Sequence, residues 1–214
     1  MHEYTFSIGF DSPFFVGAGY GRGGLFDQST IFDGTGCAYI PGSALKGKLR
    51  HVCRRVIKTL AKQGVKEPME FQTLCPSRDE PGYCRTPEPC AFCRLFGSPL
   101  HPGRFFFEDA YPSDSMDMYS RFGLDMERAF FREAQTEART RVSLERTRRV
   151  ARRGHLLSSE TGAAFLEFKG KIQGPDPEDG EALQLLDFAL RTLTHLGAGG
   201  GAGLGRIKGG LKRS

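Results

Sequence analysis

Glycines crowd the segment between Leu196 and Leu211, and this crowding is the feature that most restricts how the chain can fold. The segment contains Gly197, Gly199, Gly200, Gly201, Gly203 and Gly205. Glycine adopts positive φ freely and lets another backbone approach closely, but it also loses more entropy on folding than any other residue. A folded chain rarely keeps such a segment unless the segment holds a ligand. Because Arg206 and Lys208 follow directly, we expect an anionic ligand, with a phosphate backbone as the first candidate.

Apolar periodicity predicts strands and helices that alternate along the chain. Alternation predicts a strand from Tyr4 to Phe10, and apolar residues at helical spacing predict a helix from Ser43, its N-cap, to a stop at Gly64. Further strands are expected at 104–111, 163–172 and 204–211, and a second helix at 181–196, capped by Gly197. This order favours an α+β fold, a ferredoxin-like sheet with long insertions.

Positive charge is concentrated in two places, although the net charge of the chain is only +5. Residues 112–154 lack a clean period, and we interpret them as an extension projecting from the core. Between Arg139 and Arg153 it carries seven arginines and one acid, Glu145; the arginines are Arg139, Arg141, Arg146, Arg148, Arg149, Arg152 and Arg153. The first predicted helix carries Lys46, Lys48, Arg50, Arg54, Arg55 and Lys58 on its polar face. Such local density favours phosphate binding, with a solvated face or flexible arm as the alternative.

Four cysteines have the spacing of a metal site, Cys-x8-Cys-x5-Cys-x2-Cys, formed by Cys75, Cys84, Cys90 and Cys93. Thiolates are preferred zinc ligands, and four of them close a structural site with no open position. We therefore predict one structural Zn²⁺. The alternatives are unliganded thiols, a redox pair, or a site in which His101 replaces one cysteine. The isolated Cys37 and Cys53 are interpreted as small core residues.

Several function classes are disfavoured by what the sequence lacks. It has no run of 18 apolar residues and no signal-peptide pattern, so we expect a soluble, cytoplasmic protein with no membrane partner. It has no Walker motif, which disfavours a nucleotide-binding enzyme. Ser43 and Lys46 match a Ser-x-x-Lys acylase pattern, but the partner motifs of that pattern are absent.

Several segments, in the correct order, resemble the RAMP proteins of type III CRISPR effector complexes, and they are most similar to the backbone subunits of the Csm and Cmr complexes. Residues 39–50, Tyr-Ile-Pro-Gly-Ser-Ala-Leu-Lys-Gly-Lys-Leu-Arg, resemble the family hallmark. Residues 93–98 resemble its Leu-Phe-Gly segment, residues 141–146 with Glu160 its central Arg and Glu pattern, and residues 199–206 its glycine-rich loop. The resemblance implies a single RAMP domain over 1–214, with a cysteine-rich zinc-binding insertion at 65–99 and a thumb-like Arg-rich extension at 112–154.

The resemblance also implies a modified RNA-recognition fold whose copies stack into a filament along CRISPR RNA. Complementary target RNA and other subunits of the complex are the further expected partners. The thumb would intercalate and kink the guide–target duplex. The RNA-binding residues implied are Ser43, Lys46, Lys48, Arg50, Arg54, Arg141, Arg146, Arg148, Arg149, Gly200, Gly201, Gly203 and Arg206.

Cleavage of the target RNA is a further implication of the resemblance. The Asp that precedes the hallmark in the backbone subunits matches Asp33 here, and it would act with Mg²⁺ or another divalent cation in a 2′-hydroxyl attack. Phe32 and Gly34 stand where the family has Arg and Pro, and the spacing to Tyr39 is one residue short. Asp27 is a second candidate, and Asp33 as a turn former is the structural alternative. Two other functions stay open: a non-catalytic RNA-binding subunit, and a glycine-rich-loop endoribonuclease that processes CRISPR RNA.

Overall fold

The computed structural model describes residues 2–21, 23–62, 84, 87–113, 134–145, 147–164, 166–175, 179–209 and 212–213. Most of the predicted cysteine-rich insertion, including Cys75, lies outside these ranges. So do residues 114–133 of the predicted extension, and Arg146.

The main sheet is built around two long antiparallel strands, β1 (His2–Gly9) and β7 (Glu167–Gly174), which pair along their whole length. The short strands β3 (Phe106–Phe107) and β4 (Tyr111–Pro112) pair with the other side of β7, and β8 (Lys212–Arg213) pairs with β1. Alternate side chains of the long strands, Phe6, Ile8, Phe168 and Ile172, are buried, as the period-2 pattern predicts. Gly170 lies opposite Phe6, and a Cβ there would lie 2.5 Å from the Phe6 ring.

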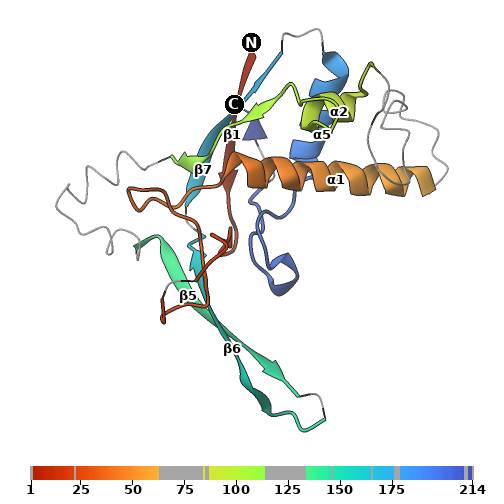
Figure 1. Ribbon diagram of the computed structural model, residues 1–214. Coiled ribbons are helices and arrows are strands. Elements are labelled where there is room, and N and C mark those ends of the chain that lie inside the picture. The colour runs from red at the N-terminus through yellow and green to blue at the C-terminus, as the bar shows by residue number, and fades with distance from the viewer. Residues whose placement is uncertain are drawn as a thin grey trace.

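Among the described residues, three α-helices complete the core beside this sheet (Figure 1). Helix α1 (Gly42–Lys62) buries Leu45, Leu49 and Cys53, which are spaced by one helical turn. Helix α5 (Gly180–Thr192) contacts both α1 and the short α2 (Ala91–Phe96). Helix α1 begins one residue before Ser43, so the N-cap prediction for Ser43 is wrong. Asp109 takes that role, because its Oδ1 accepts a hydrogen bond of 2.8 Å from the N–H of Gly42.

The described part of the predicted extension is a long β-hairpin, which we call the arm. Strands β5 (Thr136–Leu144) and β6 (Ala151–Gly162) pair antiparallel, and β2 (Gln28–Ser29) adds to β6 in parallel. Figure 1 shows the arm projecting away from the main sheet. The arm overlaps the predicted extension, but it is a regular hairpin, and its second strand continues to Gly162, beyond residue 154.

The C-terminal segment differs from the predicted helix and strand. Helix α5 ends at Thr192, and Gly197 does not cap it. Gly197 has φ 87°, and a Cβ there would lie 2.4 Å from the carbonyl oxygen of Phe15. The glycine is thus required by close backbone contact. In the described part of the strand predicted at 204–211, which ends at residue 209, Arg206 and Ile207 form single bridges, and regular pairing occurs in β8.

Candidate nucleic-acid interface and cysteine cluster

Lys46, Arg50 and Arg54 form what we call the cation stripe, because they recur every fourth residue along one side of α1. The Nζ of Lys46 lies 5.8 Å from the centre of the Phe107 ring. The Cζ atoms of Arg50 and Arg54 lie 5.7 and 5.5 Å from the centre of the Phe92 ring. Burial lowers the pKa of Lys46, and the charge of Arg50 lowers it further. Each cation of the stripe is therefore held over an aromatic face.

The other predicted residues of α1 lie outside the stripe. Ser43 is exposed in the first turn of the helix. Lys48 is half-buried, and two residues along a helix place it on a different side from Lys46.

The glycine-rich loop is preformed by its own hydrogen bonds. Gly199 and Gly203 have left-handed backbones, with φ 77° and 80°, and flank the 3₁₀ turn η2 (Gly200–Ala202). The carbonyl of Gly199 accepts hydrogen bonds from the N–H groups of Ala202 and Leu204, at 2.8 and 3.2 Å. A Cβ at Gly201 would meet no atom within 4 Å, so the tip of the loop is open to a partner.

The base of the arm brings two arginines to this loop. The Nη2 of Arg139 donates a hydrogen bond of 3.1 Å to the carbonyl of Ala202. A Cβ on Gly199 would lie 3.2 Å from the Nη2 of Arg141, whose Nε is buried without a hydrogen-bond partner in the described part of the chain. Arg141 and the glycine-rich loop, both predicted RNA-binding elements, are thus brought together.

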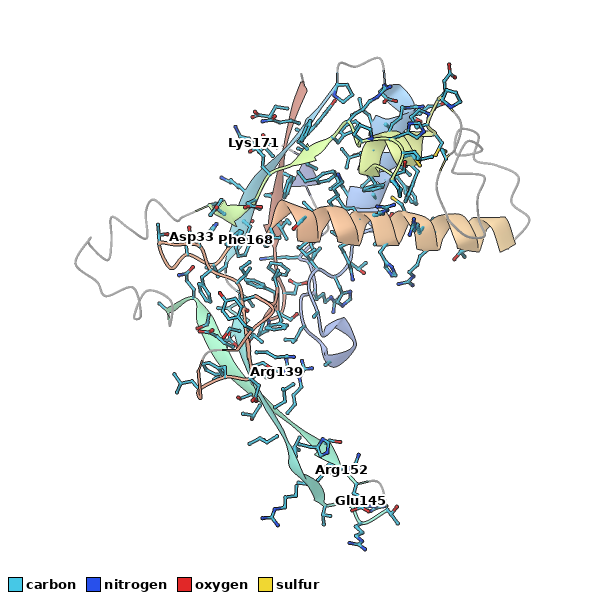
Figure 2. The ribbon with its side chains drawn as sticks, viewed as in Figure 1. Asp33, Arg139, Glu145, Arg152, Phe168 and Lys171 are labelled. Carbon is cyan, nitrogen blue, oxygen red and sulfur yellow. The ribbon has the colours of Figure 1, made fainter. Side chains whose placement is uncertain are left out.

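Two further predicted arginines, Arg148 and Arg149, lie apart from the loop. Arg148 and Arg149 are exposed at the turn of the arm, and Arg149 has φ 54°. Figure 2 shows Arg139 near the base of the arm and Arg152 at its far end. Arg206 is exposed, and its N–H donates to the Oγ of Ser12 at 3.1 Å.

The side chain of Asp33 forms hydrogen bonds within its own loop. Its Oδ1 accepts hydrogen bonds from the N–H and Oγ1 of Thr35, at 2.9 and 2.6 Å, and from the N–H of Cys37, at 2.9 Å. This is the Asx turn expected of the turn-former alternative. The neighbouring Tyr39 and Tyr111 rings stack at 5.5 Å. Burial raises the pKa of Tyr111, and the charges of Asp109 and Asp33 raise it further.

Asp27, the second candidate, is attached to the arm. Its Oδ2 accepts hydrogen bonds from the N–H and Oγ of Ser158, at 2.7 and 3.0 Å. These bonds stabilise the carboxylate and lower its pKa. The contacts of Asp27 therefore attach its loop to β6.

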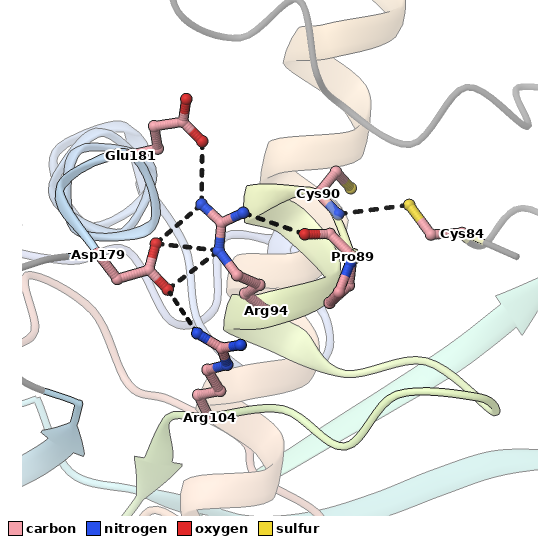
Figure 3. Close-up of polar contacts among 7 residues, drawn as sticks. All are labelled: Cys84, Pro89, Cys90, Arg94, Arg104, Asp179 and Glu181. Carbon is pink, nitrogen blue, oxygen red and sulfur yellow. Dashed lines mark hydrogen bonds and ion pairs between the residues drawn. The ribbon is translucent and has the colours of Figure 1, made fainter. Parts of the chain in front are cut away.

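Cys84, Cys90 and Cys93 form a buried cluster in which all three Sγ atoms lie within 4.8 Å of one another. Thiolates around one zinc, at about 2.3 Å from the metal, would lie roughly 3.8 Å apart, so the cluster fits a tetrahedral metal. The N–H of Cys90 also donates to the Sγ of Cys84 at 3.5 Å, a bond that orients a ligand sulfur (Figure 3). His101 is not part of this cluster, although its Nε2 is a buried atom without a hydrogen-bond partner among the described residues.

Sequence reasoning missed the ion pairs that hold this segment. The Nε of Arg94 donates to both carboxylate oxygens of Asp179 at 3.0 Å, and its Nη2 lies 2.9 Å from the Oε2 of Glu181. Its Nη1 donates to the carbonyl of Pro89 at 3.0 Å, beside Cys90 (Figure 3). We call this set of contacts the Arg94 clamp. The clamp joins α2 to the start of α5, and no local sequence motif predicts it.

Taken together, an antiparallel sheet with interleaved helices, a projecting arm and a glycine-rich loop define a protein of the α+β class, as predicted. The family model of the RAMP superfamily matches residues 8–208, and the chain belongs to this superfamily. The resemblance inferred from the sequence motifs is thereby confirmed. No helix in the described ranges has both the length and the apolar character needed to cross a bilayer.

Comparison with solved structures gives the same fold. The chain is similar to a chain in the cryo-EM structure of the type III-B Cmr-beta bound to cognate target RNA, with a TM-score of 0.62 and 14% sequence identity. The match covers 100% of this chain and 97% of the other. A search of curated proteins found no match.

Proposed function

We propose that this chain is an RNA-binding subunit of a type III CRISPR effector complex. It holds CRISPR RNA along its phosphate backbone, stacks with copies of itself and with other subunits, and presents the guide to complementary target RNA. The observation that carries the proposal is the cation stripe, because two of its three residues, Lys46 and Arg50, lie in the segment that resembles the RAMP hallmark. The similar Cmr-beta structure, which contains target RNA, supports the same function.

The stripe has the physical properties that backbone binding requires. Its members are separated by about 6 Å along the helix axis, so they can contact successive phosphates of one strand. Fixed cations bind phosphate without reading the base sequence, and their affinity falls as salt rises because bound counterions are released. Sequence information then comes from base pairing with the guide, which suits a subunit that accepts any guide.

Fluorescence anisotropy with a labelled single-stranded RNA tests this proposal. Replacement of Lys46, Arg50 and Arg54 by Gln should weaken binding about 10- to 100-fold. The slope of log affinity against log salt concentration should become shallower by roughly one unit for each lost phosphate contact. The control removes the same charge elsewhere, with Arg55, Lys169 and Arg191, all exposed, replaced by Gln. Equal losses in both variants would mean that net charge, and not the stripe, binds the RNA.

The catalytic part of the proposal is target cleavage with a divalent cation held by Asp33. The three hydrogen bonds of Asp33 end on Oδ1, so Oδ2 is the oxygen that could bind the cation. The cation would neutralise charge on the scissile phosphate. The 2′-oxygen of the preceding nucleotide would bond to phosphorus as the bond to the 5′-oxygen breaks. Its proton would reach the 5′-oxygen through solvent, which gives a 2′,3′-cyclic phosphate and a 5′-hydroxyl.

Two variants of Asp33 separate this role from turn formation. Asp33→Asn keeps an oxygen that can accept the loop hydrogen bonds but removes the charge, whereas Asp33→Ala removes both. In the assembled complex, both variants should lose EDTA-sensitive cleavage of complementary RNA. If Asp33→Asn cuts at the wild-type rate, Asp33 is excluded from the mechanism and acts as a turn former, the alternative that the three hydrogen bonds to its Oδ1 support. EDTA-resistant cutting of precursor RNA by the isolated chain would instead support a processing enzyme.

We also propose that the cysteine cluster holds one structural zinc ion, with Cys75 as the fourth ligand. Three buried sulfur atoms within 4.8 Å of one another support this site. A closed set of thiolates supplies folding stability and leaves no position for substrate.

A further inference from the structure

Helix α2 contributes a residue to the cysteine cluster and also contacts the cation stripe. Cys90 precedes this helix and Cys93 lies within it. Phe92, between them in sequence, is 3% exposed, and its ring lies beneath the guanidinium groups of both Arg50 and Arg54. The residue that supports two cations of the stripe is thus a direct chain neighbour of one predicted metal ligand, Cys93.

A continuous row of rings extends this support along the stripe. The Phe92 and Phe96 ring centres are 5.0 Å apart, and the Phe96 and Phe107 ring centres are 6.4 Å apart with nearly parallel planes. Phe107 in turn supports Lys46. We call Phe92, Phe96 and Phe107 the aromatic floor. Two of its three rings belong to α2, so the position of α2 sets the position of the floor.

Helix α2 cannot hold that position by itself. It has six residues, and isolated helices shorter than about 12 residues are marginal in water. Its N-cap, Cys90, makes no side-chain capping hydrogen bond. The contacts that fix it are the packing of its buried side chains, the Arg94 clamp on the α5 side, and the cysteine cluster at its start.

We infer that the cysteine cluster controls RNA affinity: a metal bound there fixes α2, and α2 holds the aromatic floor under the cation stripe. The inference rests on the proposed RNA-binding role of the stripe. Cations whose side chains are already ordered lose less conformational entropy when a phosphate binds, so a fixed floor increases affinity without any contact between the metal and the RNA. Phe92 is then a positioning residue that acts through Arg50 and Arg54.

The test measures RNA affinity and metal content on the same samples of the full chain. The metal-loaded chain and the chain stripped with a chelator under reducing conditions are titrated into a labelled single-stranded RNA. We expect stripping to weaken binding about three- to tenfold, and added Zn²⁺ to restore it. Circular dichroism and thermal unfolding report whether the stripped chain stays folded.

Phe92→Leu is the decisive variant, since it removes the ring but keeps an apolar side chain in the core. It should retain the wild-type metal content and bind RNA about three- to tenfold more weakly. Stripping its metal should weaken binding little further, because both changes remove the same support. Phe106→Leu is the matched control, because Phe106 is 63% exposed and lies outside the floor. It should change neither RNA affinity nor metal content.

The outcomes separate this inference from the proposed function. If the metal-loaded wild type binds no RNA, the proposed function fails and the inference fails with it. If the wild type binds RNA but Phe92→Leu binds equally tightly at wild-type metal content, the inference alone is overturned. The same holds if a folded, stripped chain binds as tightly as the loaded one. If stripping unfolds the chain, Phe92→Leu decides by itself: weaker binding supports the inference, and unchanged binding overturns it.

Discussion

The side chain of Gln135 accepts a hydrogen bond from the backbone N–H of Ala38 at 2.9 Å, and both residues are fully buried. The same side chain donates to the carbonyl of Gly36 at 3.0 Å. The carbonyl of Gln135 accepts a bond of 2.9 Å from the N–H of Ala163. Gln135, which directly precedes β5, therefore joins the base of the arm to the loop that carries Asp33.

Replacement of Gln135 by Leu should destabilise the fold by about 2–4 kcal/mol, because it leaves the buried N–H of Ala38 and the carbonyl of Gly36 without their partner. Urea unfolding at neutral pH measures the loss. Gln184→Leu on the exposed side of α5 is the control and should change stability by less than about 0.5 kcal/mol. A similarly small effect for Gln135→Leu would mean that water or another group forms hydrogen bonds with Ala38 and Gly36 in place of the glutamine.

The elements that sequence reasoning predicted correctly are those with one buried face. Phe6 and Ile8 alternate into the core from β1, and Leu45 and Leu49 repeat at helical spacing in α1. The arm has no such signal, because solvent surrounds its outer half. Val142, for example, is 47% exposed there. A strand with two exposed faces need not alternate in polarity, so its regular pairing was missed.

The site could be predicted only where its residues are close in sequence. The spacing of Cys90 and Cys93 indicated a metal site because two residues of separation fix their geometry. The pairing of Arg94 with Asp179 joins positions 85 residues apart. Contacts between positions so far apart in the sequence are produced by the tertiary packing of α2 on α5, and a single sequence contains no pattern that predicts them.

Glycines of the C-terminal loop should respond differently to alanine. A Cβ at Gly205 would lie 2.0 Å from the carbonyl oxygen of Leu196, and its φ is 69°. Gly205→Ala should therefore destabilise the chain by at least about 2 kcal/mol. A Cβ at Gly201 would meet no atom within 4 Å. Gly201→Ala should therefore change the free energy of unfolding by less than about 0.5 kcal/mol, while RNA binding weakens.

Thermal unfolding and RNA anisotropy on both glycine variants make this comparison. Gly201→Ala is the informative member of the pair, because its fold is preserved. Wild-type RNA affinity in that variant would show that the tip of the loop does not touch the phosphate backbone.

Metal content should depend on the cluster cysteines and not on the isolated ones. Cys93→Ser should reduce bound zinc from about one equivalent to a small fraction of that, because a serine hydroxyl is a poor zinc ligand. Cys53→Ser, at a buried position on α1, should keep its zinc. Elemental analysis of the purified variants provides the measurement. Absence of zinc from the wild-type chain would remove the site from the proposal.

The stability of the chain should fall at alkaline pH through Cys37 and Cys53. Burial raises the pKa of both thiols to about 12, and for Cys37 the charge of Asp33 adds to the effect. In the unfolded chain these thiols ionise near their ordinary value of 9.0. Their contribution to stability is therefore fully present below pH 9 and is lost as the pH rises towards 12.

Urea unfolding across that range tests this dependence against a variant in which both cysteines are alanine. Each thiol can lower the unfolding free energy by at most about 1.4 kcal/mol per pH unit, so the wild type should lose stability more steeply than the variant. The comparison uses the slopes of unfolding free energy against pH. Both chains share the effects of lysine and tyrosine ionisation, so these cancel, and the lower overall stability of the alanine variant does not change its slope. Parallel curves would contradict the prediction, because they would mean that neither thiol is held neutral by the fold.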